Sequence, residues 1–443
     1  MGRRSRTREL FVAMNGELVA TLTQHSTTGL TLRYSAGWLA RHNAIPISLS
    51  LPLSSEPYVG PSVASYFDNL LPDNHTIRER MQRTLNTETA TPFDLLSAAG
   101  ADCVGALQLS PGPEMKAVRG ITATPLSEAE VAHMLRSYRQ LPLGMSEDDD
   151  FRISIAGAQE KTALLWQDDR WCRPHGTTPT THILKLPMGR VDERVDLTTS
   201  VYNEWLCLAL ARQLGLPVAK AEIQRFEDVS VLVVERFDRR WSQDGSWIIR
   251  LPQEDFCQAL GVAPAYKYEA DGGPGIQASH DLLMKSMQPL EDRETFFRAQ
   301  IIYFLLAAID GHAKNFSIHL HAQGRFRLCP MYDVLSAYPT VSPKFPLQKL
   351  KLAMALHGKN RHYRLHEIRR QHFSDTAKHC GFPVTTMEDL LQDVVNRVEP
   401  AIETVAKSLK DDFPAAVADP IFAGLRGAAR KLAAEGSAAP TTR

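Results

Sequence analysis

The chain has 443 residues, of which 44% are hydrophobic and 23% are charged. This composition is typical of a globular protein and excludes the disordered and membrane-embedded classes. The 50 basic and 50 acidic side chains balance, so net charge identifies neither a nucleic acid nor a membrane surface as a partner.

The cysteines and the N-terminus predict a cytoplasmic protein. The six cysteines are scattered without a CxxC pair, which favours free thiols in a reducing compartment over a zinc site or disulfides. Asn15, Gly16 and Glu17 interrupt the apolar segment that a signal peptide would need after its basic start. The longest apolar run, Ile301–Ile309, is too short to span a bilayer and suits a buried helix.

The first part of the chain, 1–110, is expected to form a small α+β domain. Asn15-Gly16 between two apolar runs is a strong hairpin signal. The expected elements are a hairpin at Phe11–Thr23, a strand at Leu30–Tyr34, a helix at Ser62–Leu85 and a loop leading into a strand at Ala98–Leu109.

The second part, 111–250, is expected to be rich in strands. Ser127 with Glu130 forms a capping box that starts a helix over Ser127–Leu141. Gly215 and Pro217 end a second helix, Val201–Leu214. The expected strands are Ile153–Ile155, Thr162–Trp166, Thr181–Leu186 and Val229–Glu235.

The third part, 251–435, is expected to be mainly helical, with a disordered tail at 436–443. The expected helices are Glu254–Leu260, Ile276–Met287, Asp292–Ile309 and several within His366–Leu432, and one hairpin is expected at Phe316–Leu328. The glycine cluster 271–275 is interpreted as a flexible loop. A strand-rich lobe followed by a helical lobe is the order found in protein kinases, so we expect an α+β fold of two lobes.

The clearest chemical motif is Asp310 followed, after four residues, by Asn315. This is the spacing of a kinase catalytic loop, where the carboxylate orients the acceptor hydroxyl and accepts its proton while the amide oxygen holds magnesium. Lys314 could offset charge on the moving phosphoryl group. An Asp-Gly turn with solvated neighbours is the structural alternative.

Asp333 follows that loop after one expected hairpin, where a kinase places its second metal-binding carboxylate. With Asn315 and Asp310 it would supply the hard oxygen ligands that Mg²⁺ prefers. The alternative is that Asp333 caps a helical turn at Val334–Ala337.

Two further residues fit a kinase lobe. Lys185 lies in an expected strand and could bind the α- and β-phosphates, with Glu204 on the following helix as its ion-pair partner. A strand lysine that points to water is the alternative.

The phosphate-binding loop carries the weakest signal, because neither GxGxxG nor a Walker A motif is present. The candidate segment between two expected strands is Ala156, Gly157, Ala158, Gln159, Glu160 and Lys161. Backbone N–H groups of such a loop could bind phosphate, and an ordinary β-turn is the alternative.

Long motifs spread over nearly the whole chain resemble the HipA-type toxin kinases of bacterial toxin–antitoxin pairs, and among them the enterobacterial HipA. The motifs that carry the resemblance are Ser48–Leu53, Tyr66–Asp73, Thr91–Leu96, Phe151–Leu165, Val234–Asp238, Arg250–Asp255, Asp310–Ser317 and Lys351–Met354.

The resemblance implies a role for each matching position. It identifies 156–161 as the ATP-phosphate loop, Lys185 as the phosphate-binding lysine, Asp310 as the catalytic base and Ser154 as an autophosphorylation site. It implies nucleotide contacts from Glu235, Arg236, Phe237, Gln253, His312, Ala313, Lys314, Asn315, Tyr332 and Asp333, with Mg²⁺ on Asn315 and Asp333.

The resemblance also implies a biological setting. The family phosphorylates glutamyl-tRNA synthetase on serine, which halts translation and leads to growth arrest and persistence. Its partner is the dimeric helix-turn-helix antitoxin HipB, with which it represses its own operon, so the protein would join the nucleoid when bound to antitoxin and operator. Lys378 matches one basic residue that touches operator DNA, but Gly381 stands at the other position. A kinase with another acceptor and an inactive antitoxin-binding corepressor are the alternatives.

Overall fold

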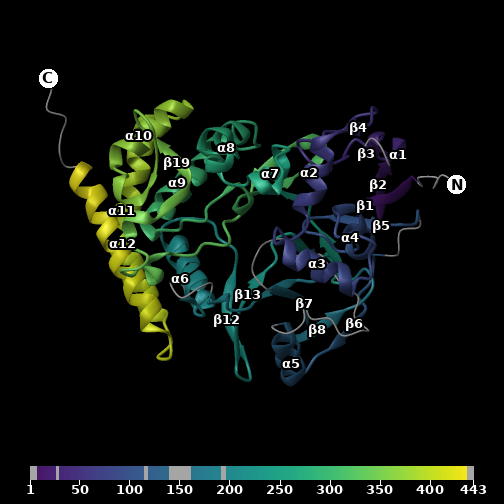
Figure 1. The fold of residues 1–443 in the computed structure, drawn as a ribbon, viewed down its shortest axis with the longest axis horizontal. Coiled ribbons are helices and arrows are strands. Elements are labelled where there is room, and N and C mark those ends of the chain that lie inside the picture. Colours follow the sequence, from purple (N-terminus) through teal and green to yellow (C-terminus); the bar gives the residue numbers. More distant parts are fainter. Residues whose placement is uncertain (1–6, 26–28, 114–117, 139–160, 191–195, 437–443) are drawn as a thin grey trace. The chain divides into compact units, whose positions relative to one another are not determined.

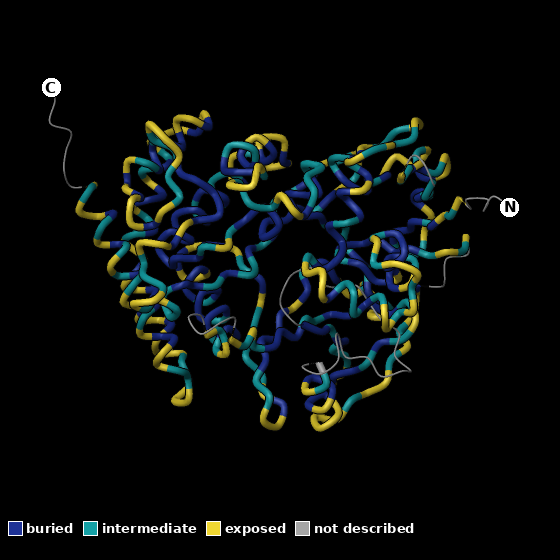
Figure 2. The backbone as a smooth tube through the Cα atoms, in the orientation of Figure 1, coloured by how far each residue is buried: buried dark blue, intermediate teal, exposed yellow. Residues whose placement is uncertain are grey.

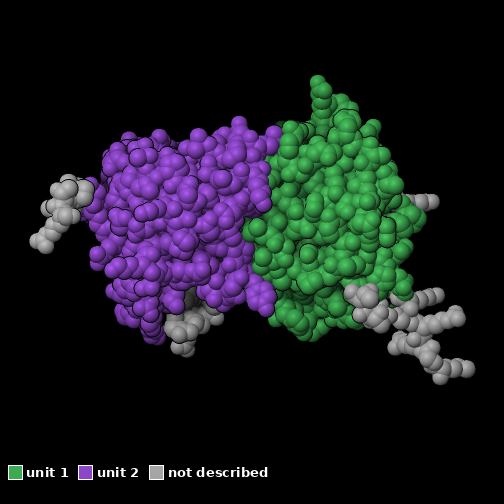
Figure 3. All heavy atoms as spheres, turned by 90° about the horizontal axis from the view of Figure 1, so that it is seen from above, with its two compact units in different colours: residues 1–186, 224–265, 317–327 green, residues 187–223, 266–316, 328–443 purple. Residues whose placement is uncertain are grey.

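The computed structural model describes residues 7–25, 29–113, 118–138, 161–190 and 196–436 (Figure 1). The chain folds into two compact units, and each unit is made of several separate stretches of sequence. The first comprises 1–186, 224–265 and 317–327, and the second comprises 187–223, 266–316 and 328–443 (Figure 3). Among the described residues, no helix is long and apolar enough to cross a membrane. All six cysteines are buried free thiols, as expected.

The first unit begins with a five-stranded antiparallel sheet in the order β4-β3-β2-β1-β5. Its strands are β1 Arg8–Met14, β2 Glu17–His25, β3 Gly29–Tyr34, β4 Tyr58–Val59 and β5 Leu107–Ser110. The expected hairpin is confirmed, and Asn15 and Gly16 at its turn have φ angles of 49° and 80°. Two adjacent positive φ angles match the twist of the flanking strands.

Four short helices accompany this sheet: α1 Ala36–Leu39, α2 Pro61–Asn69, α3 His75–Thr84 and α4 Pro92–Ala99. The single helix expected at Ser62–Leu85 is therefore two helices. The helix is interrupted at 70–74, because Pro72 cannot donate a backbone hydrogen bond. Asn74 then caps α3, since its side chain accepts a hydrogen bond from Thr76 N. Phe67 and its neighbours Leu70 and Leu71 are buried in the core against the sheet.

A six-stranded sheet follows in the order β12-β13-β9-β7-β8-β6. Its strands are β6 Ala123–Pro125, β7 Lys161–Gln167, β8 Arg170–Pro174, β9 His182–Lys185, β12 Ala221–Phe226 and β13 Val229–Glu235. Helix α5, Glu128–Tyr138, contributes to the core with the side chains of this sheet. Its expected capping box is confirmed, because Ser127 N donates to Glu130 Oε2 at 2.7 Å.

The region after residue 235 corrects one expectation. Smaller strands there are β14 Arg239–Trp241, β15 Ile248–Arg250, β16 Gln253–Asp255, β17 Ser317–Leu320 and β18 Phe326–Leu328. The helix expected at Glu254–Leu260 is shortened to the single turn α7, Phe256–Ala259, because β16 pairs with β17 before it. Pairing with a strand distant in sequence overrides local helix propensity. The hairpin expected at Phe316–Leu328 is confirmed as β17 and β18.

The second unit is mainly helical, as expected. Its helices are α6 Ser200–Gln213, α8 Ile276–Leu283, α9 Pro289–Leu306, α10 Arg370–Cys380, α11 Val384–Ser408 and α12 Ala415–Gly436. Its short strands are β10 Gly189–Arg190, β11 Asp196–Leu197, β19 Lys351–His357 and β20 Arg361–Arg364, of which the β19–β20 hairpin was not expected. Every residue from Ile301 to Leu306 in α9 is buried, which explains that apolar run (Figure 2).

A network of buried charges lies in the first unit. The guanidinium of Arg239 contacts Asp102 at 3.0 Å and Asp238 at 2.8 Å. Arg250 contacts the same Asp102 at 3.0 Å, and Arg236 contacts Asp238 at 2.7 Å. Burial alone would raise the pKa of Asp238, but Arg236 and Arg239 outweigh it and hold that pKa at about 2. The network therefore joins the loop after α4 to the β13–β15 region through ionised side chains.

Candidate active site

The expected catalytic loop lies in the second unit, directly after the buried helix α9. The helix ends at Ala307, whose backbone is left-handed with φ 50°. At Gly311 a Cβ atom would lie 2.4 Å from the ring of Tyr303, so only glycine fits beside that ring. The glycine after Asp310 is therefore explained by close packing, which fixes where the loop leaves the helix.

The loop from Asp310 to Asn315 is closed by its own hydrogen bonds. His312 N donates to the carbonyl of Asp310 at 2.8 Å, and Asn315 N donates to the carbonyl of His312 at 2.9 Å. The amide nitrogen of Asn315 donates to the Asp310 carbonyl at 2.7 Å, so its amide oxygen points away from that carbonyl. The expected Asp-x4-Asn pair is thus brought together in one tight turn, with the short 3-10 helix Ala313–Asn315 inside it.

Asp310 and His312 differ in exposure. The side chain of Asp310 is 57% exposed, whereas that of His312 is 5% exposed with its Nε2 atom 3.9 Å from Asp310 Oδ1. Burial lowers the pKa of His312, although Asp310 and Asp333 both act to raise it. A neutral imidazole beside an accessible carboxylate is an arrangement in which the carboxylate can accept a proton.

Asp333 is held close to this loop by the two residues before it. Met331 forms a parallel bridge with Val218, and the hydroxyl of Tyr332 donates to the carbonyl of Lys314 at 2.9 Å. Asp333 itself has a φ of 58°, an uncommon left-handed conformation for a residue with a side chain. No helix occurs at 334–337, so the expected alternative of a helix cap has no helix to cap.

Two buried polar atoms beside these carboxylates could meet a ligand. Within the described ranges, neither His312 Nδ1 nor the hydroxyl of Tyr303 has a hydrogen-bond partner. Burial, with Asp333 as a further cause, raises the pKa of Tyr303, so its hydroxyl stays protonated. Buried polar groups are rarely left unpaired, and here they accompany the predicted catalytic and metal-binding side chains.

The phosphate-binding candidates lie in the first unit. Lys161 in β7 is the direct register partner of Lys185 in β9, so both side chains project from the same face of the sheet. Both lysines are buried, at 7% and 5% exposure. Two ammonium groups on one face are a pair of donors that a phosphate could contact together. Glu204 is buried in α6 of the second unit, so its ion pair with Lys185 stays a prediction.

The expected hinge follows β13 in the first unit. Glu235 is opposite His182, and the guanidinium of Arg236 is committed to Asp238. The backbone N–H of Arg236 donates to the carbonyl of Thr181 at 2.9 Å, so a nucleotide contact from Arg236 would come from its carbonyl oxygen. The ring of Phe237 meets His319 edge-on at 5.6 Å, and His319 is the register partner of Gln253 in β16, so these two expected contacts share one area.

A cavity of about 380 Å³ adjoins the same hinge. Its walls include Trp166, His182, Glu235 and Trp241. His182 is three residues from Lys185 along β9, and alternate residues of a strand point to opposite faces. The cavity therefore lies on the face of the sheet opposite to Lys161 and Lys185 and is distinct from the expected phosphate site.

For several residues with a predicted functional role, the described structure gives no contact that bears on that role. Residues 156–160 and Ser154 lie outside the described residues. Lys378 is exposed near the end of α10, and Gly381 ends that helix in a left-handed conformation with φ 68°. The glycine cluster 271–275 is not an open flexible loop as expected, because a Cβ at Gly273 would lie 1.8 Å from the carbonyl oxygen of Tyr266.

One residue beside the catalytic loop was missed. Tyr268 donates its hydroxyl hydrogen to Asp310 Oδ1 at 2.5 Å. No periodicity or spacing marks it, since it lies 42 residues before Asp310 in a segment without a recognised motif.

Comparisons with known proteins agree on one family. The HipA N-terminal domain model matches residues 10–110, and the HipA-like C-terminal domain model matches 153–402. A putative kinase of Sinorhizobium fredii, Y4mE, is 34% identical over 91% of this chain and 92% of its own length. The serine/threonine-protein kinase toxin HipA of Shewanella oneidensis is 26% identical over 73% of each chain.

A solved structure shows the same fold. The Shewanella oneidensis HipA in complex with HipB and operator DNA superposes with a TM-score of 0.77, at 23% identity, over 96% of this chain and 97% of that one. The expected kinase-like α+β fold is thereby confirmed. With both family models matched in their expected order, the chain belongs to the HipA family of serine/threonine-protein kinase toxins.

Proposed function

We propose that this chain transfers the γ-phosphoryl group of ATP to the hydroxyl of a protein serine, with Asp310 as the base. The serine oxygen forms a bond to the γ-phosphorus, the bond from that phosphorus to the β–γ bridging oxygen breaks, and ADP leaves. Asp310 orients the hydroxyl and accepts its proton. The observation that carries the proposal is the closed turn in which Asn315 binds the Asp310 carbonyl while Tyr332 brings Asp333 to the same loop.

The donor set fits Mg²⁺. Asn315 and Asp333 offer hard oxygen atoms, and no cluster of three His, Cys, Asp or Glu side chains that could hold a metal occurs in the described part of the chain. A metal ion here would complete its shell with water and phosphate oxygens, as Mg²⁺ prefers. When bound, it supplies positive charge against the phosphates.

The remaining nucleotide contacts are part of the same proposal. Lys161 and Lys185 hold phosphate together with residues 156–160, and Glu204 pairs with Lys185. Backbone groups of 235–237 receive the adenine, and Gln253 and residues 312–314 are further proposed nucleotide contacts. The paired burial of Lys161 and Lys185 on one face supports this assignment. The domain boundaries expected at 110, 250 and 435 are also retained as a proposal.

The proposed acceptor and partners follow from membership of the HipA family. We propose glutamyl-tRNA synthetase as the acceptor, a HipB-type dimeric antitoxin as the partner and operator DNA bound mainly through that antitoxin, in the cytoplasm and at the nucleoid. Support comes from the Shewanella oneidensis structure, which is a complex of HipA, HipB and operator DNA. Exposed Lys378 is the proposed direct DNA contact.

The central test replaces each proposed catalytic carboxylate. Asp310→Gln and Asp333→Gln should fold normally and lower phosphoryl transfer from [γ-³²P]ATP by about 10²- to 10⁴-fold, because the base or the metal ligand is lost. Asp389→Gln, at an exposed position of α11, is the matched control. Wild-type rates in either carboxylate variant would refute the assignment.

A second experiment separates the acceptor from the chemistry. Purified glutamyl-tRNA synthetase is incubated with the full chain and labelled ATP, and a phosphoproteome is compared after induction of wild type and Asp310→Gln. Label on a serine of the synthetase supports the proposed acceptor. Asp310-dependent label on other proteins alone would point to a kinase with another acceptor, and no Asp310-dependent label would point to an inactive corepressor.

Ser154 is proposed as a switch that limits activity. A phosphate there adds roughly two negative charges next to a loop that must accept ATP phosphates, so it should oppose nucleotide binding. A chain uniformly phosphorylated on Ser154 should therefore bind ATP more weakly than the unmodified chain. Equal affinity of the two forms would contradict the switch while leaving the kinase assignment intact.

A further inference from the structure

Tyr268 is the residue outside the expected site that touches its central carboxylate. Its hydroxyl donates to Asp310 Oδ1 at 2.5 Å, and both residues belong to the second unit. The Asp310 side chain is 57% exposed. An exposed carboxylate without a fixed neighbour samples several rotamers, so a phenol bonded to one oxygen restricts where the other oxygen can point.

The ring of Tyr268 is itself fixed against the catalytic loop. It meets the buried His312 ring edge-on, with centroids 4.8 Å apart and an interplanar angle of 85°. The preceding residue adds a backbone contact, because Ala313 N donates to the carbonyl of Lys267 at 3.3 Å. Three separate contacts thus join the segment 267–268 to the turn that holds Asp310.

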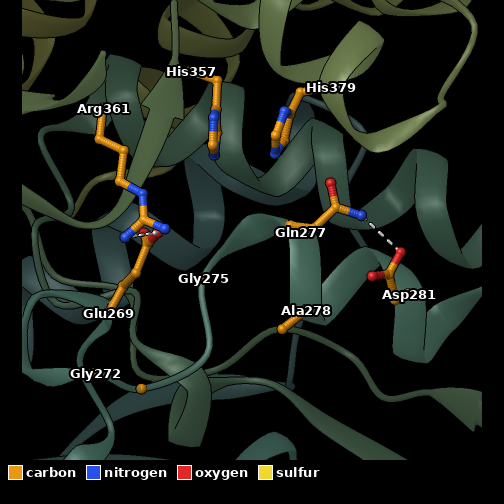
Figure 4. Close-up of a pocket in the computed structure, with 10 residues that line it drawn as sticks. Glu269, Gly272, Gly275, Gln277, Ala278, Asp281, His357, Arg361 and His379 are labelled. Carbon is orange, nitrogen blue, oxygen red and sulfur yellow. Dashed lines mark hydrogen bonds and ion pairs between the residues drawn. The ribbon is translucent and has the colours of Figure 1, made fainter.

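The loop after Tyr268 is braced from the other side. The carboxylate of Glu269 accepts a hydrogen bond from Ala355 N at 2.6 Å and lies 3.6 Å from Arg361. Figure 4 shows Glu269 and Arg361 facing each other at the wall of a cavity of about 460 Å³. At Gly275 a Cβ would lie 2.3 Å from the Glu269 carboxyl carbon, so a larger residue there would displace the Glu269 carboxylate.

We propose that Tyr268 is a positioning residue for Asp310. Its hydroxyl holds Oδ1, which leaves Oδ2 directed at the acceptor serine. The glycines of 273–275 serve this role indirectly, because they let the loop pack closely enough for Glu269 to anchor it. This inference rests on the proposed function, in which Asp310 is the base.

The test compares two tyrosines of one segment. Tyr268→Phe removes only the hydroxyl, and Tyr266→Phe does the same at a side chain that is 55% exposed. With the full chain, label from [γ-³²P]ATP is measured on the chain itself and on glutamyl-tRNA synthetase. We expect kcat to fall about tenfold in Tyr268→Phe, the effect of one hydrogen bond to a charged group. Its KM for ATP and melting temperature should match those of wild type and of Tyr266→Phe.

Other outcomes would overturn the role. An unchanged kcat in Tyr268→Phe shows that the bond does not serve the reaction, and a raised kcat shows that the phenol blocks the acceptor position. A fall in melting temperature or ATP affinity that matches the fall in rate shows a merely structural role.

A double-mutant cycle shows whether Tyr268 acts through Asp310. In an Asp310→Asn background, single-turnover rates should show no further loss when Tyr268→Phe is added, because the oriented carboxylate is already absent. A further loss of about tenfold would mean that Tyr268 acts independently and would refute the positioning role. If Asp310→Asn alone keeps the wild-type rate, the proposed function fails first. An inactive Asp310→Asn with a fully active Tyr268→Phe removes only this inference.

Discussion

Ionised side chains are buried and paired in the charge network of the first unit, whereas the central carboxylate of the catalytic loop in the second unit is exposed to solvent. Around Asp102 and Asp238, three arginines and two aspartates lie in the interior, and Asp238 stays ionised because arginines surround it. Around Asp310, the carboxylate is 57% exposed, and the buried atoms near it include a His312 nitrogen without a partner in the described structure.

The contrast indicates what each cluster is for. A buried ion pair contributes little net stability when formed, yet breaking it leaves an uncompensated charge in the interior. Such a network therefore specifies which segments must meet. The catalytic loop instead keeps acceptors and donors available for substrate, at some cost in stability, as shown by the left-handed Asp333. Substitutions in the first cluster should change stability, and those in the second should change rate.

The largest expected effect on stability comes from Asp102→Asn. It removes the charge that Arg239 and Arg250 share, both at 3.0 Å. We expect the free energy of unfolding to fall by about 3–5 kcal/mol, measured by urea denaturation, with an unchanged kcat for the fraction that remains folded. Asp228→Asn, whose ion pair with Arg136 is exposed, is the control and should leave stability unchanged. A stable Asp102→Asn would contradict the structural role of the network.

Glu254 provides a pH-dependent test in the same unit. Its side chain is fully buried, and burial raises its pKa from 4.5 to about 8. Between these values the unfolded chain releases a proton that the folded chain retains, so the contribution of Glu254 to stability should fall by about 1.4 kcal/mol for each pH unit of rise. Glu254→Gln should remove this slope, because an amide remains neutral and can still accept from Leu49 N. Glu56→Gln, at an exposed position, is the control and should leave the slope unchanged.

Unfolding at pH 5, 6.5 and 8 measures that difference. A fall in stability with rising pH that persists in Glu254→Gln would place the pH dependence in another buried acid, for example Glu269 of the second unit, whose pKa burial also raises. The division between a unit that sets stability and a unit that sets rate would then be too simple.

The smallest expected effect is at Asn15. Its side chain makes two hydrogen bonds with the backbone of Arg250, each 2.9 Å long. Asn15→Gly keeps a residue that tolerates the φ of 49° but loses both bonds. We expect a loss of about 1 kcal/mol by urea denaturation and no change in phosphoryl transfer. A loss as large as that of Asp102→Asn would show that the hairpin anchors the network, whereas a change in rate would contradict the comparison.

Local patterns in the sequence predicted much of this molecule. Asn15-Gly16 marked the first hairpin, and the Ser127–Glu130 capping box marked the start of α5. The spacing from Asp310 to Asn315 predicted a catalytic loop, and the structure joins these two residues by a hydrogen bond, while their catalytic role stays a prediction. In each case the contacts that determine the structure join residues only a few positions apart, so a short sequence motif is enough to predict them.

The sequence could not indicate features that depend on distant packing. Strand β16 forms in place of a longer helix because β17, more than 60 residues later, pairs with it. The glycines at 273 and 275 predicted flexibility, but a backbone carbonyl leaves no room for a side chain at Gly273, and the Glu269 carboxylate lies against Gly275. Tyr268 had no signal of its own, since only folding brings it to Asp310.

The buried network also sets an order of events during synthesis. Asp102 leaves the ribosome 137 residues before Arg239 and 148 residues before Arg250. At about 5–20 residues per second, its carboxylate has to wait on the order of 10 s for those two arginines. The loop after α4 therefore cannot reach its final buried state while the nascent chain ends at residue 110. The N-terminal domain then completes its folding only as the kinase strands emerge, and a released N-terminal fragment would expose the loop that carries Asp102 to proteases.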